Sequence, residues 1–115
     1  MPLPSEEHFS ADGAFILSVD ALDGDDVAIG FRNFPWHTHA DILSSMRNTP
    51  EPLAVRAFVD EILNDAAVIA MRYVDNIVSD VWVSDDPRSD LRYCQSNERI
   101  EFRYWSGAPF SPSST

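Results

Sequence analysis

Lysine is absent from this sequence of 115 residues, and all eight of its basic residues are arginine. The absence of lysine excludes Schiff-base chemistry and any phosphate-binding loop that depends on a lysine. Cysteine is nearly absent, since Cys94 stands alone and allows no internal disulfide. No apolar run approaches the roughly 18 residues of a membrane span, and the first residues form no apolar signal core. These absences predict a cytoplasmic protein that does not enter a membrane.

Acidic residues are present in large excess. Nineteen of them stand against eight basic residues and give a net charge of −11 at pH 7. A field this negative opposes the approach of nucleic acid and of anionic lipid, so a charged partner is expected to be basic. Hydrophobic residues make up 44% of the chain, which distinguishes it from a disordered acidic tail and predicts a folded domain.

The strongest structural signal is an amphipathic helix that begins near Pro50. Apolar residues recur along it at spacings of three and four, at Val55, Phe58, Val59, Ile62, Leu63 and Ala66. Thr49 is expected to cap this helix, with Pro50 at its first position. Residues 67–74, which follow, are apolar at odd and even positions alike, a pattern typical of a strand covered on both sides. We predict that this strand lies at the centre of a sheet.

Other patterns predict the remaining strands and a short helix. Residues 14–20 and 27–34 are β-prone runs separated by an Asp-Gly turn signal, which predicts a hairpin. A short helix is expected from Thr38, with Asp41 in its first turn and an apolar side formed by Ala40, Leu43 and Met46. Alternation over residues 77–84 predicts a strand that returns beside the central one.

The last pattern is a hairpin with its turn at residues 96 and 97, preceded by a loop over residues 85–90. In this register Leu91 faces Phe102. Cys94 lies in the middle of a strand, where a cysteine usually acts as a small hydrophobic residue.

Taken together, the elements follow the order ββααββββ. This order predicts an α+β domain with a mostly antiparallel sheet and two tandem helices packed on one face. Residues 1–12 are expected to form a loosely ordered leader, residues 13–106 a single domain, and residues 107–115 a flexible tail.

Two site hypotheses centre on the stretch before the short helix. His37 and His39 would point the same way on an extended chain, and Asp41 would add an oxygen ligand, which makes a half-site for zinc or nickel. The same histidines, with Trp36 and Arg32, would also suit a pocket for an anionic small molecule. The alternative to both hypotheses is an ordinary loop at the start of a helix, in which Trp36 packs against the core and Asp41 caps the helix. We expect no cofactor.

Motifs for catalysis are missing from the sequence. It has no G-x-S-x-G elbow, no H-E-x-x-H and no glycine-rich phosphate loop. The acidic loop over residues 20–26 lacks the twelve-residue spacing of an EF-hand and is expected to be a solvated turn. The sequence therefore favours a protein without catalytic activity.

Two surfaces are candidates for binding another protein. One is the exposed face of the long helix, and the other is the outward face of the sheet, where tryptophan and arginine are the types enriched at interface centres. The residues predicted to contact a partner are Asp60, Glu61 and Asp65 on the helix and Trp82, Arg103 and Trp105 on the sheet.

We therefore predict a small acidic protein-binding module that engages a basic partner, or a second copy of itself through the open sheet face. By size, acidity and tryptophan content it is similar to the small bacterial immunity and inhibitor proteins that neutralise basic toxins. This similarity is one of composition, and no sequence motif supports it. The alternative is a small-molecule or metal-binding domain, with or without enzymatic activity, whose pocket lies around Trp36, His37 and His39.

Overall fold

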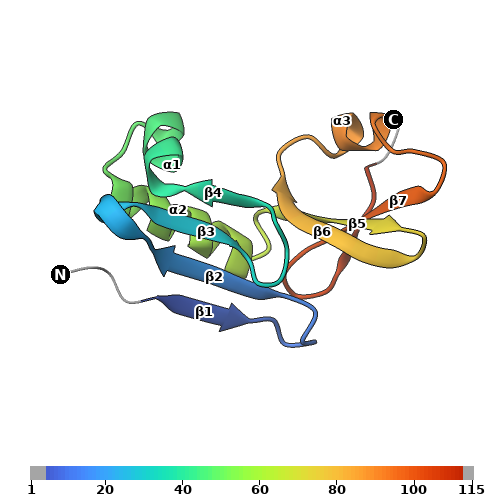
Figure 1. Ribbon diagram of the computed structural model, residues 1–115, viewed down its shortest axis with the longest axis horizontal. Helices are drawn as coiled ribbons and strands as arrows, with labels where there is room; N and C mark the ends of the chain where they lie inside the picture. The colour runs from blue at the N-terminus through green and yellow to red at the C-terminus, as the bar shows by residue number, and fades with distance from the viewer. Residues whose placement is uncertain (1–4, 113–115) are drawn as a thin grey trace.

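The computed structural model describes residues 5–112 and shows two antiparallel sheets with helices beside them (Figure 1). The predicted α+β class is confirmed. The elements are β1 (Glu6–Phe9), β2 (Ile16–Ala21), η1 (Asp23–Asp25), β3 (Val27–Phe31), β4 (His37–His39), α1 (Ala40–Arg47), α2 (Glu51–Leu63), β5 (Val68–Val74), β6 (Ile77–Ser84), α3 (Pro87–Arg92), β7 (Glu98–Arg103) and β8 (Pro109–Phe110).

The strands are more numerous than predicted, and within residues 5–112 they divide into two sheets instead of one. The first sheet has the order β1-β2-β3-β4 and the second the order β6-β5-β7-β8. In the first sheet, Leu17, Val19 and Ile29 turn inward and are buried. They share one apolar cluster with Leu43 of α1 and Ile62 of α2, so both helices cover the inner side of this sheet.

The second sheet is built around β5, as the sequence predicts. Ile69, Ala70 and Met71 are buried in succession, which requires cover on both faces of the strand. β5 and β6 are joined by a two-residue turn in which Asp75 and Asn76 have φ values of 51° and 69°. Positive φ at both central residues is the requirement of a type I′ turn, which matches the twist of a hairpin.

The end of the chain differs from the predicted hairpin. Residues 87–92 form α3, because the Asp86 carboxylate accepts a hydrogen bond from the Ser89 amide at 3.2 Å and Pro87 suits the first helical turn. The predicted pairing of Leu91 with Phe102 is therefore wrong. Cys94 lies in the connection that follows α3, half-buried, and not in a strand.

Both ends of the described chain contain a strand that was not predicted. Residues 6–9 of the expected leader form β1, which pairs with β2. Residues 109 and 110 of the expected tail form β8, and the Phe110 ring contacts Phe102 and Tyr104 with centroids 6.2 and 5.9 Å away. Residues 1–4 and 113–115 lie outside the described residues.

The two sheets meet through side chains from both halves of the chain. Trp105 stacks on Phe15 with ring centroids 6.1 Å apart and an interplanar angle of 23°. The Trp36 amide donates a hydrogen bond to Asp80 of β6 at 3.2 Å. Trp105 is only 9% exposed, so the prediction that it points outward is wrong. The alternation that placed it outside ends with β7 at Arg103, and the turn after β7 redirects the chain inward.

No helix among the described residues has both the length and the apolar character needed to cross a membrane.

Candidate functional site

A groove of about 570 Å³ lies between the helix pair and the second sheet. One wall comes from α1 and α2, and the other from β6, α3 and β8. This volume falls within the range of about 300–1,000 Å³ that is usual for ligand sites. Segments far apart in the sequence build it, since α1 and α2 lie beside the first sheet, whereas α3 lies on the side of the second sheet (Figure 1).

The lining of the groove is largely apolar and aromatic. Its apolar side chains include Trp36, Leu43, Met46, Phe58, Trp82, Val83 and Phe110. Met46 is 73% exposed, although the sequence pattern placed it on the inner side of α1. Met46 lies in the last turn of α1 and stands at the rim of the groove.

Carboxylates line both walls of the groove. On one wall, Asp90 of α3 accepts hydrogen bonds from the Trp82 indole at 3.1 Å and from the Ser84 hydroxyl at 2.6 Å. These bonds fix the Asp90 side chain and tie α3 to β6. On the other wall, Glu61 accepts two hydrogen bonds from the Arg47 guanidinium at 2.7 and 2.8 Å.

The Arg47–Glu61 pair makes stability depend on pH. Hydrogen bonds from Arg47 hold the pKa of Glu61 below the 4.5 of an ordinary glutamate, so the pair stabilises the fold fully above about pH 4.5 and less as the pH falls through the lowered pKa. Glu61→Gln is expected to lower the unfolding free energy by at most about 1 kcal/mol at neutral pH, because the Glu61 side chain is 43% exposed and screened by solvent.

Denaturant unfolding measured from neutral pH to about pH 3 checks this prediction, since the difference between the two proteins should shrink toward acid. Glu51→Gln, at an exposed position of the same helix, is the control. A Glu61→Gln difference that is constant with pH would show that the ion pair does not contribute.

The structure places the residues predicted to contact a partner on several separate parts of the fold. Asp60 is exposed on α2 but lines a separate, smaller hollow. Asp65 is not on the helix, because α2 ends at Leu63; it has a φ of 60° and accepts a hydrogen bond from the Ser106 amide. Arg103 pairs with Glu101 at 3.3 Å. Trp82, half-buried, is the predicted sheet residue that lines the groove.

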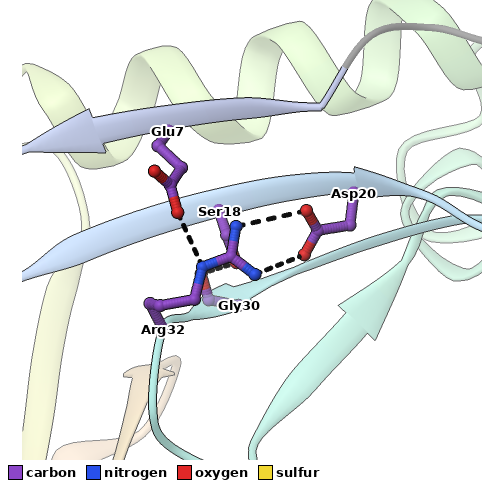
Figure 2. Close-up of polar contacts among 5 residues, drawn as sticks. All are labelled: Glu7, Ser18, Asp20, Gly30 and Arg32. Carbon is purple, nitrogen blue, oxygen red and sulfur yellow. Dashed lines mark hydrogen bonds and ion pairs between the residues drawn. The ribbon is translucent and has the colours of Figure 1, made fainter.

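The predicted anion pocket corresponds to a hollow of about 340 Å³ on the outer face of the first sheet. Figure 2 shows the Arg32 guanidinium held between two carboxylates, with Glu7 at 2.7 Å and Asp20 at 3.1 and 3.2 Å. The hydrogen bonds that Arg32 donates to Asp20 and then to Glu7 raise the pKa of Arg32. Since both carboxylates neutralise it, Arg32 adds no net positive charge to the hollow.

The two histidines lie on one face of β4, as predicted for an extended chain. Their ring centroids are 4.9 Å apart, and His39 Nδ1 lies 3.0 Å from a carboxylate oxygen of Asp26. Asp41 does not join them, since its carboxylate accepts a hydrogen bond from the Ile42 amide. Across the described residues, no group of three or more His, Cys, Asp or Glu side chains is placed to hold a metal ion, and the three residues of the predicted half-site are not brought together.

The predicted caps of the two helices are each displaced by one residue. His39 and not Thr38 is the N-cap of α1, and Pro50 and not Thr49 is the N-cap of α2. Since β4 continues through His39, Thr38 pairs with Ile29 in the sheet and is not available to the helix.

Sequence reasoning did not find the groove, because its walls depend on how the two sheets meet. The available signals were Phe110 in an otherwise polar tail and the acidic run before α3. A search of the chain against protein-family models, curated proteins and solved structures finds no match.

Proposed function

We propose that this protein is a non-catalytic binding module of the immunity or inhibitor type, which holds a basic partner protein. The observation that carries the proposal is the distribution of charge. Among the described residues, carboxylates of the same chain form ion pairs with several arginines, which include Arg32, Arg47, Arg99 and Arg103. Many carboxylates remain exposed, including Asp23, Asp41, Glu51, Asp60, Asp75, Asp85 and Asp86.

The consequence is a surface field that is negative over most directions of approach. Such a field raises the rate at which a basic protein associates and discourages acidic partners. It also discourages a second copy of this chain, which carries the same net charge of −11. A heterologous basic partner is therefore favoured over the homodimer.

The test is to capture partners from extract of the host cell and to measure association kinetics with the purified partner. We expect the partner to be basic, and the association rate to fall about tenfold or more between roughly 10 and 150 mM salt. An acidic partner, or an association rate indifferent to salt, would contradict the proposal.

The hollow on the outer face of the first sheet supports a second candidate, a small-molecule site. The observation in its favour is the pair of histidines beside a hollow that Trp36 and His37 line. Replacing His37 and His39 by alanine separates the two functions: a binding module keeps its affinity for the protein partner, whereas a small-molecule site loses its ligand.

A further inference from the structure

The groove between the helix pair and the second sheet combines large apolar side chains with carboxylates. Its lining includes large apolar side chains, with the exposed Met46 at its rim and the half-buried Trp82 and Phe110 on the opposite wall. Methionine and tryptophan are typical of sites that bind other proteins, because one adapts its shape and the other buries a large area. The same groove carries the carboxylates of Asp85 and Asp90.

Arg47, although it lines the groove, does not reverse this charge. Its guanidinium donates two hydrogen bonds to Glu61, so the pair is neutral as a unit. The opposite wall therefore determines the net charge of the groove, and it presents Asp85 and Asp90 with the half-buried Trp82 ring beside them. A carboxylate next to an indole ring suits a guanidinium, which forms ion pairs with one and stacks on the other.

We infer that this groove receives a segment of the partner protein in which an arginine stands next to a large apolar side chain. The arginine pairs with the carboxylates of Asp85 and Asp90, and the apolar side chain packs among Met46, Phe58 and Phe110. The inference rests on the proposed function and names the place and the chemistry of the contact. Charge complementarity selects this occupant over a second copy of the acidic chain.

The test uses capped tripeptides as probes and NMR of the labelled protein as the readout. The Trp82 indole N–H, which donates to Asp90, reports directly on the charged wall of the groove. We expect acetyl-Leu-Arg-Phe-amide to shift this signal and those of groove residues, and acetyl-Leu-Gln-Phe-amide to bind at least about tenfold more weakly. Equal affinity for the two peptides would overturn the assignment of an arginine.

Three variants locate the binding. Met46→Arg adds a positive charge at the rim of the groove, whereas Leu53→Arg and Ile77→Arg add the same charge at positions outside it, with exposures of 73%, 62% and 71% respectively. Because all three side chains are exposed, the fold should tolerate each change. We expect Met46→Arg to lower the affinity for the arginine peptide about tenfold. The other two variants should retain that affinity within about twofold.

Other outcomes separate the inference from the proposed function. If all three variants lower the affinity for the arginine peptide equally, the acidic surface as a whole attracts the peptide and the groove is not its specific binding site. If no peptide shifts the groove signals at millimolar concentration, the inference fails while capture of a basic partner can still succeed. If the arginine peptide binds the groove but the captured partner is acidic, the proposed function fails by itself.

Discussion

Trp105→Ala is expected to lower the unfolding free energy by about 3–5 kcal/mol, the range found when large aromatic side chains are removed from cores. Trp105 is 9% exposed and belongs to the apolar cluster that both sheets share. Its stacking on Phe15 joins the segment after β7 to the segment before β2, so its loss leaves a cavity where the two halves meet. Denaturant unfolding measures the change.

Two further variants decide whether the cause is packing. Trp105→Phe keeps an aromatic ring against Phe15 and should cost clearly less than the alanine variant. Phe9→Ala removes an exposed aromatic ring from β1 and should change the unfolding free energy by no more than about 0.5 kcal/mol. If Trp105→Ala kept full stability and lost the partner instead, the outward orientation inferred from the sequence would be supported.

The elements predicted correctly from the sequence are those whose hydrophobic periodicity matches the side-chain burial seen in the structure. α2 was predicted from its 3.6-residue period, and β5 from an apolar run with no polar face. β6 was predicted at residues 77–84 from the alternation of apolar and polar residues along it. In each case the residues that decide the structure are neighbours in the chain.

The sequence did not predict what depends on distant contacts. α3 is only six residues long and is supported by the Asp86 cap and by the bonds of Asp90 to β6, so a short polar stretch looked like a loop. The period of two along β7 was extended to Trp105 past the end of the strand. The division into two sheets, and with it the groove, follows from the way the halves pack and leaves no periodic signal.

The second large effect is expected at Gly30 of β3, because the backbone at Trp36 and His37, where β4 begins, lies close to the Gly30 Cα. A Cβ atom added at Gly30 would lie 2.7 Å from the carbonyl oxygen of Trp36 and 3.1 Å from the Cβ of His37. The nearer atom is backbone, which cannot rotate away, so Gly30→Ala must displace β4 from β3. We expect a loss of about 1–3 kcal/mol in unfolding free energy, the usual cost of overpacking.

Because β4 leads directly into α1 and Trp36 lines the groove, the displacement should extend beyond the clash itself. NMR signals of the Trp36 indole and of His39 are expected to shift in Gly30→Ala, and binding of the arginine peptide to weaken with them. Ala28→Ser is the matched control, since it adds one atom on the same face of β3 at a position that already has a Cβ and should cost no more than about 0.5 kcal/mol. Equal stability of Gly30→Ala and Ala28→Ser would show that β4 can move away from β3 at little cost, and that the close approach does not fix the wall of the groove.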